Sequence, residues 1–424
     1  MTVVQTGQQS LYAPPESSRA PVEAPADPDV RFTHLDVLRG FALFGMFMVH
    51  LTYYAKGSGR VHDAILTSVN YAFESKFYAL FAFLFGVSFA VQMTRANARG
   101  AHFVQLYVRR LVGLGVIAIA IKLVFDFNVL TFYTTWGVAL LLVRNLSRRW
   151  ILVLLAFCIV AVSVWQLATG TQYLLREGSI ERAKIALTRD GQARRAAFQA
   201  NLRQKKGPYL QAVRARAQHL RMMVTQRYWW CPDMQDLGLF LLGLLAVRGG
   251  VVERPREHRR VILRFMAGGA ALFAVSVIIE HLGLMDKVDL GYAPWTGAVA
   301  ALLAIPGQFY LMFFYAGAVV LWGLSLLAPL GWTGRMALTS YVIQLVFLEG
   351  VLGSHGFATG ISTWSIPIAC VAFIAMQVLI SKWWLRRFRF GPVEWLWRSF
   401  TYAAVQPMRR PVVTTPPMHF EPSR

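Results

Sequence analysis

The sequence predicts an all-α fold, a polytopic transmembrane helical bundle of about ten spans with both termini in the cytoplasm. Hydrophobic residues make up 56% of the 424 residues, and the mean hydropathy is +0.45. Apolar runs of about 18 residues or more, long enough to cross a bilayer, recur along the chain. Arginines gather in the short connections between these runs, as expected of cytoplasmic loops.

The net charge of +22 would favour a nucleic-acid partner in a soluble protein. Here the basic residues lie between apolar segments, so membrane lipid head groups and topology are the better explanation. We expect no nucleic-acid partner. The three cysteines, Cys158, Cys231 and Cys370, lie far apart and form no pattern typical of a metal site or a disulfide. We therefore expect no metal site.

The chain divides into five predicted parts. Residues 1–31 are rich in Pro, Ser, Gln and Ala and predict a disordered tail without a signal-peptide core. Residues 32–169 form a first transmembrane half of five spans, 170–233 a basic extracytoplasmic insert, and 234–402 a second half of five spans. Residues 403–424 form a second disordered tail. We expect a multi-pass protein of the cell (inner) membrane.

The predicted spans follow the apolar segments in order. They are 35–55, 76–94, 110–125, 129–143, 150–169, 234–248, 261–284, 294–327, 336–353 and 364–384. With ten spans, every arginine-rich connection falls on one side of the membrane, together with both termini. Segment 294–327 is longer than one span needs and contains Pro306, so we expect it to tilt or kink there.

The first span carries polar groups at helical spacing. At about 100° per residue, Asp36, Leu43, His50 and Tyr54 share one stripe, and Arg39 lies beside it within reach of an ion pair with Asp36. Charged groups at membrane depth normally face protein or a wet cavity. This spacing predicts a polar seam facing the inside of the bundle.

Two interpretations of these groups stay open. Thr33 and Asp36 have the spacing of a capping box, which would make Asp36 and Arg39 a structural cap and clamp at the membrane surface. Alternatively, Asp36 and Arg39 contribute to a binding site. His50 is either a hydrogen-bonded packing residue or a catalytic base or nucleophile, since its imidazole titrates near neutral pH. Glu280 or Glu349 would orient it if their helices meet.

The insert holds thirteen Lys or Arg between Arg176 and Arg227 against three acids. After Gly207–Pro208, apolar residues at steps of three and four predict an amphipathic helix. The insert is either a solvated helical hairpin packed on the bundle or a basic lid that binds anionic lipid or glycan.

Near the C-terminus, the sequence from Gly391 to Glu394 predicts a helix start, with Glu394 in the first turn and Arg398 four residues on. In the functional interpretation this segment lies near Asp36 and Arg39. Its arginines would then hold the phosphates of a coenzyme A-like donor.

Several motifs resemble those of one family. Arg31 followed by LDVLRGFALFGMFMV is similar to the N-terminal signature of YeiB-like membrane proteins, and KFYALFAFLFG (76–86) and Arg109–Arg110–Leu111 match two further motifs. GRMALTSYVIQ (334–344) and WWLRRFRFGPVEWLWRSFTY (383–402) resemble the hallmarks of the family's C-terminal domain of unknown function, DUF418. The resemblance extends from Arg31 to Tyr402, and the insert matches in position only.

That family is grouped with heparan-α-glucosaminide N-acetyltransferase-like membrane acyltransferases, in which a membrane histidine relays an acyl group from a cytoplasmic thioester to an outer sugar. The resemblance therefore implies acyl transfer, with acyl-coenzyme A as donor and no permanently bound cofactor. This chain departs from the family at His50, where members commonly have Asn. It also has Lys122 and Phe127–Asn128 where members carry a His and a Gly-Asp pair, although Asp126 lies close by.

Three functions compete. The preferred one is an acyltransferase that uses catalytic His50 and a binding site of Asp36, Arg39, Glu394 and Arg398, and that acylates an extracytoplasmic glycan or lipid. The alternative is a transporter or permease for a small molecule or lipid without covalent chemistry. A third is an envelope scaffold in which the polar groups only lock the helices together. The sequence does not select an oligomeric state.

Overall fold

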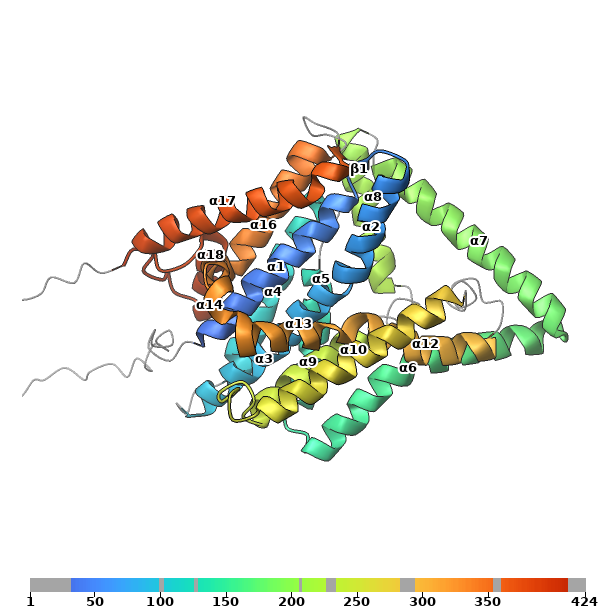
Figure 1. Ribbon diagram of the computed structural model, residues 1–424, viewed down its shortest axis with the longest axis horizontal. Coiled ribbons are helices and arrows are strands. Elements are labelled where there is room, and N and C mark those ends of the chain that lie inside the picture. Colours follow the sequence, from blue (N-terminus) through green and yellow to red (C-terminus); the bar gives the residue numbers. More distant parts are fainter. Residues whose placement is uncertain are drawn as a thin grey trace, which may run out of the picture. The chain divides into compact units, whose positions relative to one another are not determined.

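The computed structural model describes residues 32–98, 103–125, 129–205, 208–225, 234–282, 294–353 and 360–410, and they are mostly helical (Figure 1). Within these ranges, strand is limited to β1 (Ala55–Lys56) and β2 (Ile361–Ser362), which pair in parallel. The predicted all-α class is confirmed. The predicted tail 1–31, most of the tail 403–424, and Asp126 lie outside the described residues.

The helices before the second half of the chain are α1 (Thr33–Thr52), α2 (Arg60–Phe73), α3 (Lys76–Ala98), α4 (Phe103–Val124), α5 (Leu130–Val143), α6 (Arg148–Glu177), α7 (Ile180–Lys205) and α8 (Tyr209–Thr225). Those that follow are α9 (Met234–Arg248), α10 (Arg259–His281), α12 (Pro294–Tyr310), α13 (Met312–Ala318), α14 (Leu324–Leu327), α15 (Leu330–Arg335), α16 (Ala337–Phe347), α17 (Ile366–Arg387) and α18 (Pro392–Tyr402). Three short helical segments, Val319–Gly323, Leu348–Leu352 and Thr363–Ser365, connect some of them.

Fewer helices are long enough to cross a bilayer than the ten predicted spans. Among the described residues, six helices are long and apolar enough, or seven if the bent helix α6 is one span. The predicted spans 129–143, 234–248 and 336–353 form helices too, but these are shorter than the roughly 20 residues that a bilayer core needs. Hydropathy located the helices but overestimated how many have full spanning length.

Helix α1 lies at the centre of the packing. It contacts α2, α3, α15, α16 and α17 (Figure 1). It is apolar on nearly every side, and most of its residues are buried. Phe47, for example, is fully buried and stacks on Phe373 of α17, with 4.4 Å between ring centroids. A helix apolar all round is expected where other helices surround it. The polar side chains of α1 therefore meet protein, as the sequence predicted for Asp36.

Segment 294–327 is helical over most of its length. Pro306 lies inside α12, and the helix is interrupted five residues later, at Leu311, between α12 and α13. A π-helical turn, Val319–Gly323, follows before α14. Helix α12 packs against α10 and α6 and continues past the proline, which membrane helices tolerate.

Arginines gather at one end of the bundle. Arg39 of α1 reaches α3, Arg95 of α3 stacks over Phe32 at the start of α1, and Arg110 of α4 stacks on Trp397 of α18. Helix α9 starts beside the start of α3, since Tyr78 donates a hydrogen bond to Asp236, so Arg248 at its end lies at this same end. We call this the arginine end. The placement agrees with the predicted one-sided connections, and its assignment to the cytoplasm stays a prediction.

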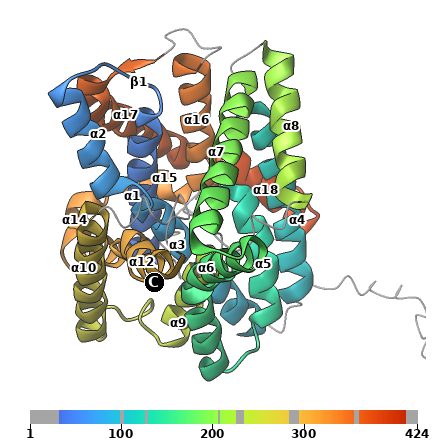
Figure 2. The same ribbon diagram turned by 90° about the vertical axis from the view of Figure 1, so that its right-hand side faces the viewer.

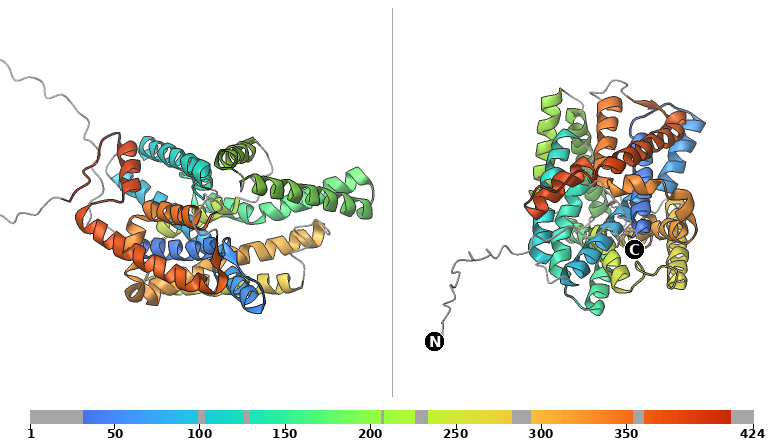
Figure 3. Two further views of the ribbon diagram at one scale, coloured as in Figure 1. Left: turned by 90° about the horizontal axis from the view of Figure 1, so that it is seen from above. Right: turned by 90° about the vertical axis from the view of Figure 1, so that its left-hand side faces the viewer.

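The basic insert forms helices at the opposite end. Helix α6 continues to Glu177, eight residues beyond the predicted span, and α7 returns from it to α8 (Figures 2 and 3). Arg216 of α8 is 3% exposed and donates a 2.7 Å hydrogen bond to the carbonyl of Val124, the last residue of α4. A cation at a helix C-terminus is favourable because the terminal carbonyls lack helical partners. The predicted helix after Pro208 is present as α8, and it packs on α4.

Candidate functional site

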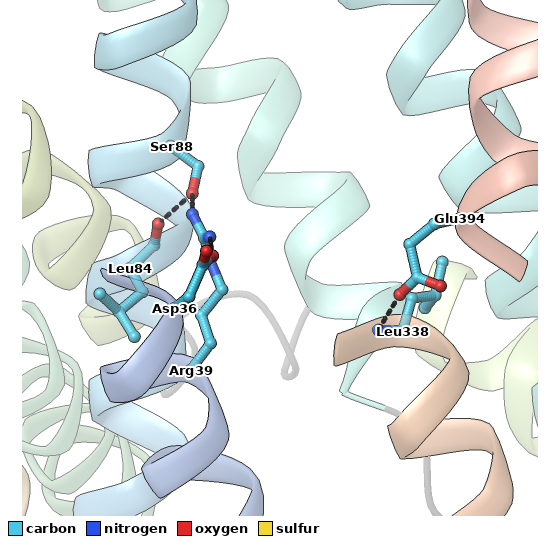
Figure 4. Close-up of polar contacts among 6 residues, drawn as sticks. All are labelled: Asp36, Arg39, Leu84, Ser88, Leu338 and Glu394. Carbon is cyan, nitrogen blue, oxygen red and sulfur yellow. Dashed lines mark hydrogen bonds and ion pairs between the residues drawn. The ribbon is translucent and has the colours of Figure 1, made fainter. Parts of the chain in front are cut away.

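An ion pair within α1 lies at the arginine end, and its arginine also hydrogen-bonds α3. Asp36, 3% exposed, lies 2.9 Å from Arg39, whose other terminal nitrogen donates a 2.8 Å hydrogen bond to Ser88 of α3 (Figure 4). Ser88 in turn donates to the carbonyl of Leu84. The predicted pair of Asp36 and Arg39 is confirmed. The predicted capping role of Thr33 is wrong, because Phe32 precedes the helix without any side-chain cap and Asp36 bonds to Arg39.

The glycines of two sequence motifs bring α1 against α15. A Cβ atom on Gly334 would lie 1.8 Å from the carbonyl oxygen of Asp36, and one on Gly40 would lie 2.0 Å from that of Leu330. Real Cβ atoms do not approach backbone so closely, so both positions need glycine. The motifs around Arg39–Gly40 and Gly334–Arg335 therefore first serve close helix packing.

Glu394 links α18 to the start of α16. Its carboxylate accepts hydrogen bonds from the backbone N–H groups of Leu338 (2.6 Å) and Thr339 (3.0 Å) and from the Thr339 hydroxyl (Figure 4). It thus caps another helix, whose free N–H groups attract negative charge. Burial raises the pKa of Glu394, and the hydrogen bonds from Thr339 and Leu338 oppose that rise. Helix α18 begins at Pro392, as predicted.

Arg110 lies between the two predicted groups of binding residues. Its guanidinium stacks 3.9 Å from the ring centroid of Trp397, whose indole N–H donates a 2.8 Å hydrogen bond to the Arg110 carbonyl. It is close enough to Arg39 and Arg398 for their charges to interact. Arg398 stacks on Phe390 at 4.5 Å. The fold thus brings together three arginines from α1, α4 and α18.

His50 lies at the other end of α1. It belongs to the last turn, and its ring centroid is 6.5 Å from that of Tyr53. Fourteen residues separate it from Asp36, a rise of roughly 21 Å along the helix. The predicted seam therefore has two separate polar ends.

A cavity of about 300 Å³ opens between the end of α1 and α2. Val49 and Thr52, which flank His50 in the sequence, line it on one side. From α2 and the turn after it come Leu66, Thr67, Val69, Asn70 and Glu74. Two hydroxyls, an amide and a carboxylate in a partly apolar cavity suit a small polar ligand.

Glu280, one of the two acids predicted to orient His50, has other neighbours. Glu280, at the end of α10, hydrogen-bonds Tyr71 of α2 and interacts with Lys76. Lys76 is 3% exposed, stacks 4.9 Å from the Phe273 centroid and donates to the Asn70 carbonyl. Glu349 lies in the π-helical turn after α16. The Glu280 contacts therefore place that acid at the α2–α3 turn.

Sequence reasoning missed several polar contacts. Asp236, 4% exposed, accepts a hydrogen bond from Tyr78, and the Tyr133 hydroxyl donates to the Tyr78 carbonyl at 3.4 Å. An acid just inside an apolar segment was the available signal for Asp236. Nδ1 of His62 lies 2.6 Å from the Thr363 hydroxyl, which itself donates to the Lys56 carbonyl. No spacing in the sequence could have linked His62 to Thr363, which lie 301 positions apart.

The packed helices and buried polar groups define a multi-pass helical membrane protein. Residues 31–187 match the family described as heparan-alpha-glucosaminide N-acetyltransferase, catalytic, and residues 246–404 match the protein of unknown function DUF418. The chain thus has a DUF418 region, is similar to the YeiB-like proteins as its motifs indicate, and has an N-terminal region like that catalytic domain.

Relatives with similar sequences carry names without a function. The uncharacterized protein YxaH of Bacillus subtilis is 27% identical over 406 residues, which covers 89% of this chain and 95% of YxaH. The uncharacterized protein YeiB of Escherichia coli is 29% identical over 194 residues, 43% of this chain and 46% of YeiB. No solved structure matches the chain significantly.

Proposed function

We propose that this protein is a membrane-bound acyltransferase. It would move an acyl group from a coenzyme A-like thioester at the arginine end to an extracytoplasmic glycan or lipid acceptor at the opposite end. One observation carries the proposal: α1 joins an arginine cluster at its start to a last turn that contains His50 and whose residues Val49 and Thr52 line a cavity. The match of residues 31–187 to an N-acetyltransferase catalytic family supports the same chemistry.

The arginine end suits the phosphates of the donor. Arg39, Arg110 and Arg398 come from three helices, and a guanidinium binds phosphate through two parallel hydrogen bonds. Trp397 fixes the plane of Arg110, which reduces the entropy lost on binding. Asp36 holds Arg39 in place. Glu394 supports the site indirectly, since it fixes α18 to α16 and so positions Arg398.

The acyl transfer itself would use His50. Its neutral imidazole nitrogen attacks the thioester carbonyl, the C–S bond breaks, and the thiol leaves with a proton from the imidazole. The acceptor hydroxyl or amine then attacks the acyl-imidazole, gives up its proton and releases His50 in its original form. The separation of roughly 21 Å between Asp36 and His50 requires an extended donor arm along α1.

Mass spectrometry of envelope lipids and glycans tests the proposal. Cells with the protein should contain an acylated species that deletion removes, and His50→Ala should remove it while leaving the protein level unchanged. The matched control is His62→Ala, which alters a second imidazole at the same end and should retain the product. An unchanged amount of the acylated species in His50→Ala cells would contradict the role of His50. So would loss of that species in the His62→Ala control alone.

Transport is the second candidate, and the irregular helical turns favour it. The π-helical turns Val319–Gly323 and Leu348–Leu352 are of a kind that occurs frequently at functional sites. Reconstituted vesicles would distinguish the two functions. Uptake of labelled metabolite with no new covalent product would support transport and contradict acyl transfer.

A further inference from the structure

The second half of α6 carries an apolar groove outside the site described above. The helix bends by 47° between Ala161 and Ser163. Beyond the bend, a groove of about 480 Å³ has mostly apolar described lining. These lining residues are Val164, Leu167, Ala168, Thr171, Gln172 and Leu175. Val164 is 54% exposed and Leu175 is 80% exposed.

The groove has the dimensions of a lipid tail. From Val164 to Leu175 the helix rises by roughly 16 Å, about the length of an extended acyl chain. Its polar lining residues, Thr171 and Gln172, lie in its second half, before Leu175, and the Thr171 hydroxyl already bonds the Leu167 carbonyl. The first half of the lining is therefore wholly apolar, and the second half is mixed.

Positive charge follows where the groove ends. Arg176, with a side chain 73% exposed and 3.7 Å from Glu177, comes directly after Leu175, and Arg182 is exposed in the first turns of α7. Between positions 176 and 205 the chain has eight Lys or Arg against three acids. Exposed Ile180 and Ile185 lie among these charges on α7. Apolar and basic side chains on one helix are typical of segments that lie in the membrane interface.

We propose that the end of α6 and the start of α7 bind an anionic phospholipid. One acyl chain lies along the groove from Val164 to Leu175, and the phosphate binds Arg176 and Arg182. The excess of positive charge selects an anionic over a zwitterionic head group. The apolar length selects a lipid over a free anion or a glycan. This site is independent of the proposed acyl transfer.

Native mass spectrometry of the full-length purified protein tests the proposal. The probes are a phosphatidylglycerol and a phosphatidylcholine with the same acyl chains, and glycerol phosphate as the head group alone. Retention of phosphatidylglycerol should fall roughly 30-fold in the double variant Arg176→Gln/Arg182→Gln, the combined effect of two basic groups near an anionic lipid. Removing the same charge at the arginine end, in Arg254→Gln/Arg256→Gln, should leave retention unchanged.

A second variant tests the groove without changing charge. Ala168→Trp fills the groove and should displace the tail, while Ala196→Trp adds the same bulk on exposed α7 and should not. Size-exclusion profiles and circular dichroism check that each variant folds. Equal retention of both lipids, unchanged retention in Ala168→Trp, or full competition by glycerol phosphate would overturn the proposal. So would a preference for an anionic oligosaccharide over the phospholipid.

Discussion

The carboxylate of Glu394 accepts a 2.6 Å hydrogen bond from the backbone N–H of Leu338, 56 residues earlier in the chain. Through this bond, α18 supplies the cap that the sequence of α16 lacks, because Met336 before the helix makes no side-chain cap bond. The same helix carries Trp397, which stacks on Arg110. One carboxylate therefore connects the packing of α16 to the geometry of the arginine end.

Replacing Glu394 with alanine should destabilise the protein. The N–H groups of Leu338 and Thr339 would lose their acceptor, and a buried polar group without a partner costs about 1–3 kcal/mol. Glu394→Gln keeps one oxygen as an acceptor for these N–H groups, so it should lose less stability than Glu394→Ala. Thermal unfolding in detergent measures both. Equal midpoints for Glu394→Ala and wild type would show that water replaces the cap.

The stability contributed by Glu394 should depend on pH. Burial raises the pKa of Glu394, so the folded state binds its proton more tightly than the unfolded state does. The resulting contribution to stability is fully present below the ordinary carboxyl pKa, about 4.3, and is lost as pH rises through the raised value. The stability of wild type relative to Glu394→Gln should therefore decline with rising pH. A difference that grows with pH would contradict this sign.

Short-range relationships were predictable from the sequence, and long-range ones were not. The pair of Asp36 and Arg39 follows from a three-residue step on one helix, which fixes their proximity before any packing is known. The contact of Glu394 with Leu338 depends on how α16 and α18 pack, and no local spacing encodes that. Similarly, hydropathy predicted the helical segments, while the change from α12 to α13 falls at Leu311 and not at Pro306.

The site shows the same limit. The sequence identified Arg39 and Arg398 as binding candidates, and the fold places both near Arg110, which had been noted only as part of a motif. The sequence also suggested Glu280 as a partner for His50. In the structure, α10 ends beside Tyr71 and Lys76. Which helices touch is decided by packing of many weak contacts, so a single polar residue cannot reveal its partner.

Gly334→Ala should be strongly destabilising. Its Cβ would lie 1.8 Å from the carbonyl oxygen of Asp36, a backbone atom that moves only if α1 and α15 separate. Overpacking of this kind costs typically 1–3 kcal/mol or more. Gly268→Ala is the matched control, because a Cβ there has nothing within 4 Å and alanine favours the helix. A midpoint for Gly334→Ala as high as that of the control would mean that the interface is looser than described.

Asp36 and Arg39 should act as a coupled pair. Removing one member of a fully buried ion pair costs about 3–5 kcal/mol, and this pair should cost less because the Arg39 side chain is 25% exposed. We expect Asp36→Asn and Arg39→Gln each to lower thermal stability, and the double variant to lose less than the sum. A double-mutant cycle by thermal unfolding measures this coupling. Strict additivity would indicate that other contacts of each residue determine its effect.

Arg216 should hold the basic insert against the bundle. Its guanidinium bonds the terminal carbonyl of α4 and is 3% exposed, so Arg216→Leu keeps much of the apolar bulk but removes the hydrogen bond and the charge at the helix end. We expect backbone amides of α8 to exchange with deuterium roughly tenfold faster or more, since 1.4 kcal/mol corresponds to one factor of ten. The exposed Arg221→Leu on the same helix is the control. Faster exchange at the far ends of α1 and α3 as well would show that Arg216 supports the whole fold and not the local packing of α8.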